Sequence, residues 1–588
     1  MSSLSIAQSI AFSGLSATQV QISVASANIS NADTKGYTQK TANQASSVTG
    51  GVGTGVTISG ITSTVDKLLL KSLVAADSDL GAADTGNSYL TELAQLYGST
   101  TSSGSSTTGT SLANTIAALE TALSSLASTP SSASLQSNAM SALDAVTTQL
   151  QQTSDGVQKL RANADQDIAS SVSDINSDLQ QISDLNKQIK QEAAAGQSTA
   201  DLEDQRNSAL QDLASMMNVS YFTASNGDIQ VYTGSGQALV DSTAHPLSYT
   251  AAANVTASTT YGAGGFSGIT VNGVDITSQI SSGKVGALIT LRDQTLPAAQ
   301  SQLDELARQL ASSINAVSNQ GTSVPPPASL TGTAAASSAT LLSATGTVRI
   351  AVADKSGNLV SYGDLDLSSY ATVGDLVTAI NGISGLSASI DANGHLSIAA
   401  TGSGNGVAIN QMTGAVGSPS AGFSDYFGLN DLVTGTGASD IAVRGDILSG
   451  TAGVPTATLD ASSTLTAGSQ VLSSGSATMV NALLSTLTGS TSFAMAGGLG
   501  ATTGSFTDYA ATIVASVAGK ATQASVTFTA KQTTQSTYAN SLSSQSGVNI
   551  DEETANLSTL QNKYAAASQL IQVINTMFSS LMTAMQAS

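Results

Sequence analysis

Residues 557–585, LSTLQNKYAAASQLIQVINTMFSSLMTAM, carry the strongest periodic pattern in the chain. Apolar and aromatic residues recur there in alternating steps of 3 and 4, at Leu557, Leu560, Tyr564, Ala567, Ile571, Ile574, Phe578, Leu581 and Met585. This alternation places one apolar stripe along a helix, the pattern of a coiled coil. Asp551, followed by Glu552 and Glu553, predicts the start of that helix. Its side chain is expected to be the N-cap, with all three carboxylates at the positive end of the helix dipole.

A second stripe lies near the other end of the chain. Ala11, Leu15, Thr18, Ile22, Ala25 and Ile29 follow one another at steps of 4, 3, 4, 3 and 4. Proline, which breaks helices, is absent from 1–129 and from 456–588. The two ends are therefore predicted to be long helices that pair with each other or with neighbouring copies.

The interior of the chain predicts a helical rod. Apolar residues keep helical spacing over 134–192, a stretch without proline that would reach about 90 Å as one helix. Gly156 is the single glycine inside it, and Gly196 is predicted to end it. Shorter helices are predicted over 201–216 and 285–319, with a kink or break at Pro297.

The middle of the chain has the signals of β-structure. The dipeptides Asn-Gly at 226–227, 272–273 and 393–394 are typical of hairpin turns. Around the last of them, apolar residues alternate with serine over 386–390 and 396–398, which predicts a two-stranded hairpin. The Pro-rich segment 321–328 is a linker candidate, and the Ser/Thr/Gly-rich tract from Ser99 to Ser111 predicts a flexible loop.

These patterns together predict an α+β multidomain protein. It combines terminal helices forming a coiled-coil core, a long helical rod domain and β-rich outer domains. The expected units are an N-terminal helical assembly segment (1–70), a helical rod region (71–217), a β-rich domain (218–280), a helical return to the rod (281–320), an inserted β-rich outer domain (331–435), a second return to the rod (436–540) and a C-terminal coiled-coil assembly segment (541–588).

Composition excludes several classes of function. The 588 residues include 18 Lys and Arg against 39 Asp and Glu, a formal net charge of −21, so a basic nucleic-acid binder is not expected. The absence of cysteine excludes disulfides, thiol catalysis and cysteine-ligated metal. The chain has no run of 18 consecutive apolar residues, so no membrane-spanning helix is predicted. No basic residue precedes Lys35, so an ordinary cleaved secretory signal is not expected either.

No residue pattern predicts a catalytic, cofactor or metal site. The two histidines, His245 and His395, stand alone, and the second follows a hairpin turn. The Gly-rich stretch 402–406 lacks the Lys-Ser/Thr of a phosphate loop. Arg206, with Glu203 or Leu202 three and four positions before it, is expected to make a helix-surface contact or a contact with the shaft.

Several blocks resemble one known group of proteins. Residues 25–38, ASANISNADTKGYT, resemble the N-terminal signature of flagellar rod, hook and hook-associated proteins. Residues 546–553, SGVNIDEE, and the later NTMF at 575–578 are similar to the C-terminus of the hook-associated protein 1 family. The segments IN (175–176), LNKQI (185–189), DLEDQR (201–206), LRDQTLP (291–297) and GFSDYFGLND (422–431) also resemble that family. Gln39 departs from the arginine common there after Gly-Tyr-Thr.

The resemblance implies a non-enzymatic structural protein of the bacterial flagellum, placed between hook and filament. It implies self-assembly into a ring at the distal end of the hook and export through the flagellar type III apparatus, which fits the missing cleaved signal. No cofactor is implied. The implied partners are copies of the chain itself, hook protein, the second junction hook-associated protein and an export chaperone on the C-terminal segment, without nucleic acid or membrane insertion.

The residues expected to carry assembly lie on the two stripes and in the signature: Leu15, Ile22, Ile29, Tyr37, Leu557, Leu560, Tyr564, Ile571, Ile574, Phe578 and Leu581. The terminal segments are expected to order on assembly, because burial of their apolar side chains then offsets the entropy cost. The alternatives are a hook or filament subunit, a secreted adhesin built on the β domains, and a secreted enzyme such as a muramidase. The last would need a pair of catalytic carboxylates, and none stands out.

Overall fold

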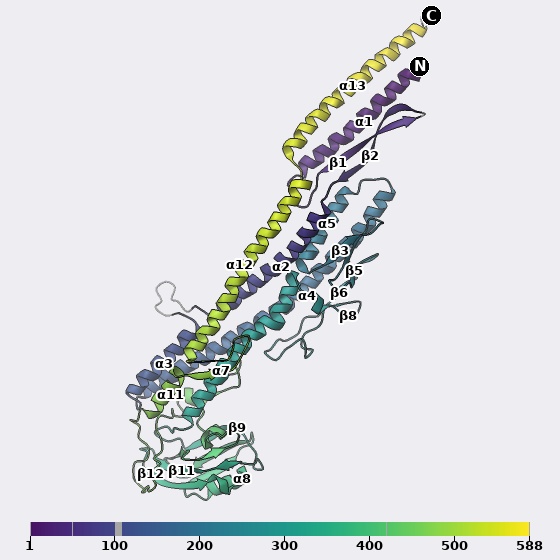
Figure 1. Ribbon diagram of the computed structural model, residues 1–588. Coiled ribbons are helices and arrows are strands. Elements are labelled where there is room, and N and C mark those ends of the chain that lie inside the picture. Colours follow the sequence, from purple (N-terminus) through teal and green to yellow (C-terminus); the bar gives the residue numbers. More distant parts are fainter. Residues whose placement is uncertain (1, 50, 100–108, 419, 587–588) are drawn as a thin grey trace.

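The computed structural model describes residues 2–49, 51–99, 109–418 and 420–586. Most of the predicted loop at 99–111 therefore lies outside the described residues. The molecule is elongated, with both termini at one end and strands β9, β11 and β12 at the other (Figure 1). The α+β multidomain class is confirmed, because long helices alternate with small antiparallel sheets along the chain.

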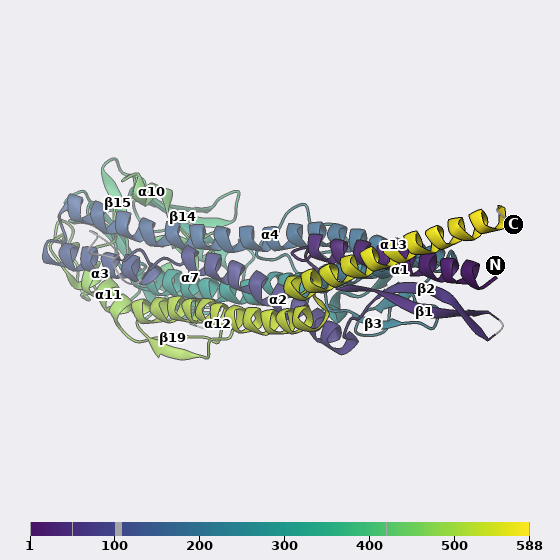
Figure 2. The same ribbon diagram turned by 90° about the horizontal axis from the view of Figure 1, so that it is seen from above.

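Long helices run up and down the length of the molecule. Seen from above, α2, α4, α7 and α12 lie next to one another, and α1 and α13 extend beyond them toward the termini (Figure 2). The helices are α1 (Ser2–Ser30), α2 (Lys67–Leu96), α3 (Leu112–Ser128), α4 (Ala133–Ala194), α5 (Ala200–Met216), α6 (Gly283–Thr290), α7 (Leu296–Ser318), α8 (Val373–Asn381), α9 (Phe423–Phe427), α10 (Gly445–Leu448), α11 (Thr478–Thr488), α12 (Phe506–Ser546) and α13 (Ile550–Gln586).

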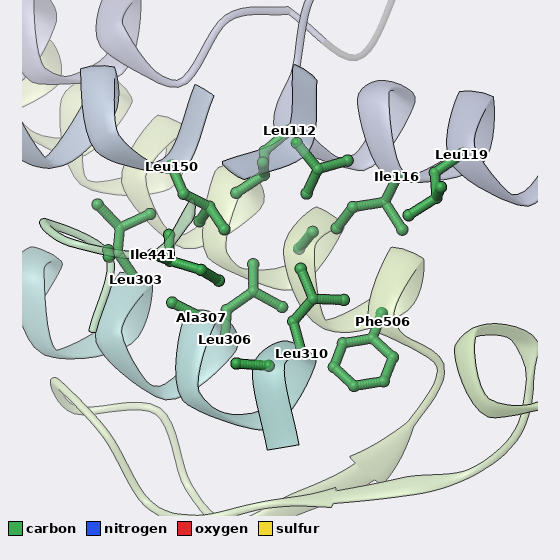
Figure 3. Packing of buried hydrophobic residues seen from close by; sticks show 14 of the residues in the cluster. Leu112, Ile116, Leu119, Leu150, Leu303, Leu306, Ala307, Leu310, Ile441 and Phe506 are labelled. Carbon is green, nitrogen blue, oxygen red and sulfur yellow. The ribbon is translucent and has the colours of Figure 1, made fainter. Parts of the chain in front are cut away.

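Helix α4 confirms the predicted rod. It spans 62 residues, and Gly196, which follows its end, has a φ of +72° that suits glycine. The mid-helix Gly156 has a packing reason, because a Cβ there would lie 2.8 Å from Leu96 Cδ1 of α2. Helices α3, α4, α7 and α12 share one apolar core (Figure 3), in which Ile116, Leu150 and Leu310 are completely buried.

The break predicted near Pro297 is a π-helical turn just before it. Residues Leu291–Thr295 form this turn, which separates α6 from α7 and leaves Pro297 in the first turn of α7. Proline is tolerated there because the first N–H groups of a helix have no partner within the helix. The shorter helix predicted over 201–216 is also confirmed, as α5.

The β-structure is a set of small antiparallel sheets. The hairpin predicted around 393–394 is confirmed, with Ile390 opposite Leu396, and the other two Asn-Gly pairs are also turns between paired strands. The strands between α5 and α6 are β3 (Ser220–Thr223), β4 (Ile229–Tyr232), β5 (Ala238–Val240), β6 (Leu247–Ser248), β7 (Thr270–Val271) and β8 (Val274–Asp275).

A larger β-rich unit follows α7. Its strands are β9 (Ser329–Ala335), β10 (Ala344–Thr345), β11 (Thr347–Asp354), β12 (Leu359–Asp366), β13 (Leu386–Ile390), β14 (His395–Ala400), β15 (Asn405–Asn410) and β16 (Ala415–Val416), followed by the pairs β17 (Val433–Thr434) with β18 (Ala442–Val443) and β19 (Thr491–Phe493) with β20 (Thr502–Gly504). Its main core lies between the sheets β12-β11-β15 and β13-β14-β9 and helix α8.

Two features differ from the sequence expectation. The N-terminal segment, predicted as helical, contains a long hairpin of β1 (Lys40–Thr49) and β2 (Val52–Ser63) beside α1. Its first strand is mostly polar, and the alternation of Val56 and Ile58 with Thr57 and Ser59 in the second was not recognised as a strand. The predicted N-cap Asp551 is wrong, because α13 begins one residue earlier and the Asn549 side chain accepts from the N–H groups of Asp551 and Glu552.

Candidate assembly interface

The two terminal helices pair with each other inside one chain. Helices α1 and α13 lie side by side and antiparallel, so the start of α1 and the end of α13 lie together at the tip that carries the termini (Figure 1). Ala11 packs there against Ile571 and Ile574, with Leu4, Ala7 and Leu15 at the edge of this cluster. Part of both stripes is thus buried without a second copy.

The predicted assembly residues divide between this contact and the solvent. Leu560, Ile571 and Ile574 are buried, Leu15, Ile22, Ile29, Tyr37, Leu557 and Phe578 are half-buried, and Tyr564 and Leu581 are exposed. A further row of apolar side chains on α13 is exposed at helical spacing: Leu570, Val573, Met577 and Leu581. Ile6, Ile10 and Phe12 are exposed on α1. The tip therefore presents apolar surface that its own chain leaves uncovered.

The N-terminal signature is tied to α5 by one buried carboxylate. Asp204 accepts hydrogen bonds from the Thr38 amide (2.9 Å) and the Thr38 hydroxyl (2.7 Å), and its Oδ2 forms an ion pair with Lys40. Both charged side chains are more than nine-tenths buried. Asp201 lies 3.7 Å from Lys40 Nζ but is largely exposed. Asp204 thus holds the start of β1 against the rod.

A second buried carboxylate ties the same signature to α13. Glu553 Oε1 accepts from Asn28 Nδ2 (3.1 Å) and Gln39 Nε2 (2.6 Å). Asn28 is completely buried; its amide donates also to the Lys40 carbonyl, and its Oδ1 accepts from the Lys40 amide and the Tyr37 hydroxyl. Three segments remote in sequence therefore meet at residues 37–40, which we call the signature joint.

Electrostatics at the signature joint keep Tyr37 protonated. Burial, reinforced by the negative charges of Asp201, Asp204 and Glu553, raises the pKa of Tyr37 to about 12. Its hydroxyl therefore remains a donor to Asn28 at neutral pH. Tyr37, expected among the assembly residues, thus makes a polar contact within its own chain.

Of the two contacts expected for Arg206, also in the DLEDQR block, the structure shows the one with the shaft and not the one on the helix surface. Its side chain is buried and Nη1 donates to Asn186 Oδ1 of α4 (2.9 Å) and to the Gly227 carbonyl (3.0 Å). The reason for the difference is that α5 packs on α4, so this face of the short helix turns inward.

Two other family-like blocks also contain polar residues that bond to remote segments of the chain. In the LRDQTLP block, Arg292 forms an ion pair with Asp165 of α4 (2.9 Å), and its guanidinium lies 4.3 Å from the Phe266 ring centroid. In the GFSDYFGLND block, Asp431 Oδ1 accepts from Asn319 at the end of α7 (2.6 Å). These contacts fix the rod to the π-turn and the rod to the outer β-rich unit.

Four residues of these contacts were not predicted as site residues from the sequence: Asn28, Lys40, Asp204 and Glu553. Each lies in or next to a family-like motif, so the motifs located the joint without indicating its contacts. A polar Asn28 on the same helix face as Ala25 and Ile29 was the one local signal, because an amide there needs buried partners.

Chemistry of other kinds has little support in the described part of the chain. No group of three or more His, Cys, Asp or Glu side chains among the described residues is arranged to hold a metal ion. Of the helices described, none combines the length and the apolar character that crossing a bilayer requires. His245 contacts Asp241 (3.0 Å), and His395 lies at the start of β14.

Comparison with known proteins gives four matches to family models. The helical domain of flagellar hook-associated protein FlgK matches residues 99–328, and the flagella basal body rod protein model matches residues 9–38. The C-terminal model of the flagellar basal body rod proteins FlgEFG matches residues 540–584, and the flagellin hook IN motif matches residues 347–402. Asn28 and Glu553, whose side chains bond to the signature joint, fall inside the second and third of these matches.

Curated relatives carry one name. The chain is 25% identical over 320 residues to flagellar hook-associated protein 1 of Salmonella typhimurium, covering 53% of the chain and 56% of the relative. It is 27% identical over 329 residues to flagellar hook-associated protein 1 of Escherichia coli, covering 52% and 55%. The match thus spans about half the length of these relatives.

A solved structure of the flagellar hook junction protein FlgK from Burkholderia pseudomallei is also similar. It has 18% sequence identity and a TM-score of 0.47, covering 80% of this chain and 98% of the other. The resemblance seen in the sequence motifs is confirmed by the FlgK domain match and by the shared name of the curated relatives.

Proposed function

We propose, from the premise that this chain is a relative of flagellar hook-associated protein 1, that it is a structural axial protein of the flagellum that joins hook to filament. It self-assembles into a ring at the distal end of the hook. Its partners are its own copies, hook protein, the second junction hook-associated protein and an export chaperone on the C-terminal segment. It is exported through the flagellar type III apparatus and performs no catalysis.

One observation carries this proposal. The α1–α13 pair buries Ile571 and Ile574 within the chain and leaves Val573, Met577 and Leu581 exposed on the same helix. Apolar side chains at helical spacing on a free helix face favour packing against further helices. Burial of each is worth about 1.5–3 kcal/mol at most, before the entropy cost of ordering is subtracted.

The proposed assembly residues therefore act in two ways. Leu15, Ile571 and Ile574 hold the helix pair together. Tyr564 and Leu581, with Val573, contact neighbouring copies. The helical segments 1–70 and 541–588 form the inner assembly region, and the β-rich 331–435 unit lies outside the ring. In this arrangement the helical rods stack as inner layers between hook and filament.

Deletion of the gene tests the junction role. Electron microscopy of the cells, with a flagellin assay of the medium, should find hooks without filaments and flagellin lost to the medium. Absent hooks would instead indicate a hook or rod subunit. Normal filaments would refute the axial role, and loss of surface adhesion would then favour the adhesin.

Complementation of that deletion tests the two classes of residue. Ile571→Asp should abolish incorporation, because a charge would enter the contact between α1 and α13. Leu560→Asp should do the same, because it places a charge at a buried position. Val573→Asp should leave the folded monomer intact, as judged by circular dichroism, and still block incorporation. Ser558→Asp, an exposed polar position on the same helix, is the control and should restore filaments. Normal incorporation of the three apolar variants would exclude this assembly mechanism.

A further inference from the structure

A groove with a positive lining lies on the rod beside the signature joint. It occupies about 590 Å³ between the start of α2, helix α5 and the β3–β4 hairpin. Lys67, Lys71 and Arg206 line it together with the apolar side chains of Leu70 and Phe222. Glu203 is the single acidic residue in the lining, so the groove is cationic on a chain of formal net charge −21.

The two lysines are placed where a helix disfavours them. Lys67 and Lys71 stand four residues apart in the first turns of α2, where the one neighbouring carboxylate, that of the N-cap Asp66, accepts from the amides of Leu68 and Leu69. Like charges at this spacing repel, and cations oppose the positive end of the helix dipole. Among the described residues neither lysine forms an ion pair, and both are exposed. Such an arrangement is stabilised when an anion binds.

Arg206 adds a second, independent indication. Its side chain is 94% buried (6% exposed), and no described group lies within hydrogen-bond distance of its Nε. A buried guanidinium N–H without an acceptor is costly, and no carboxylate bonds to this arginine. The groove therefore has unused capacity for a carboxylate, beside an apolar wall with a half-exposed Phe222.

A segment with complementary chemistry starts α13. Ile550 is 47% exposed, and the side chains of Asp551 and Glu552 are also exposed, whereas Glu553 turns inward to the signature joint. This corner thus presents one apolar side chain next to two carboxylates. The groove offers an apolar wall next to two lysines.

The corner and the groove lie on different sides of the same backbone. Side chains 38 and 40 point to α5, whose Arg206 lines the groove, whereas side chain 39 points to Glu553 of α13. Successive side chains of an extended segment point to opposite sides. A ring built by a repeated rotation joins one side of each subunit to the opposite side of the next.

We propose that the acidic corner Ile550-Asp551-Glu552 of one copy docks into the Lys67-Lys71-Arg206 groove of the neighbouring copy in the ring. This inference rests on the proposed self-assembly and adds the residues that link one copy to the next. The carboxylates pair with the lysines, and the isoleucine packs on the apolar wall. The contact is heterologous, so it does not stop at a dimer, and it gives a ring where the repeated rotation closes.

Cysteine cross-linking tests the contact on a clean background, because the chain has no cysteine. Lys71→Cys and Glu552→Cys are placed in two separately tagged copies and expressed together in the deletion strain. After oxidation, isolated flagella should contain a covalent dimer that carries both tags. Exported protein that has not assembled should contain no such dimer. Lys355→Cys, exposed on the outer unit, replaces Lys71→Cys in the control and should give no mixed dimer.

Charge reversal provides the second measurement. Lys67→Glu with Lys71→Glu should not impair folding, since glutamates suit the start of a helix, yet incorporation should fall at least tenfold. Adding Asp551→Lys and Glu552→Lys to the same chain should restore most of it. Lys159→Glu with Lys355→Glu makes the same change in net charge at exposed sites elsewhere and should incorporate normally.

The two proposals fail in different ways. If the cysteine variants restore filaments but give no mixed dimer, and the reversed lysines still incorporate, the corner does not occupy the groove, although the junction role stands. If deletion of the gene leaves filaments normal, the junction role itself is refuted.

Discussion

Replacement of Asp204 by asparagine should open the signature joint. Asp204 and Lys40 are buried together, and the asparagine side chain cannot compensate the lysine charge. Breaking a buried pair on one side costs about 3–5 kcal/mol. Asp201, at 3.7 Å from Lys40 Nζ, retains part of the compensation, so we expect about 3 kcal/mol. The local opening equilibrium should then shift about 100-fold, at 1.4 kcal/mol for each factor of ten.

Limited trypsin digestion measures this opening. Lys40 is buried in the closed joint, and its cleavage rate follows the population of the open form when opening and closing are fast. Asp204→Asn should therefore raise the rate of cleavage after Lys40 about 100-fold, while cleavage after the exposed Lys35 stays nearly constant.

Asp201→Asn is the matched control, because it removes a neighbouring carboxylate whose side chain is 75% exposed. It should change the rate at Lys40 less than about fivefold, in line with a surface ion pair of at most 1 kcal/mol. Equal rates for the two variants would refute the conclusion that Asp204 closes the joint.

Two further predictions concern the rod. Burial, with Asp212 and Asp174 nearby, raises the pKa of Asp178 to about 6, so the folded chain holds this proton more tightly and stability falls as the pH rises from about 4 to 6. The shift corresponds to about 3 kcal/mol, and solvent screening at this half-exposed side chain reduces that to about 1 kcal/mol. Asp178→Asn should therefore raise the free energy of unfolding at pH 7 by about 1 kcal/mol. The control Asp155→Asn should leave the free energy of unfolding unchanged. Gly283→Ala should destabilise the chain by more than 2 kcal/mol, since φ is +74° and the Cβ would lie 2.5 Å from Met217 N. Gly236→Ala, at φ +92° with no atom within 4 Å, should cost about 1 kcal/mol, and thermal melts that find the two variants equal would contradict the close approach.

The sequence by itself determined the helices and many of the turns. Three patterns are local: the 3-4 spacing of the terminal stripes, the long apolar repeat of α4 and the three Asn-Gly turns. They follow directly from the geometry of helices and turns, so the sequence predicts them. The family-like motifs also came from the sequence, and they marked where the contacts between segments would lie. The β1–β2 hairpin was not predicted, because its first strand carries little apolar alternation.

Only the tertiary structure decided which partners these motifs have. Asp204 and Glu553 looked like ordinary surface residues of helices, yet they are buried on two sides of residues 38–40. Their partners stand 166 and 514 positions away in the chain, a separation over which no periodicity carries information. A buried carboxylate is tolerated where several segments bring donors to it, and that convergence is a property of packing.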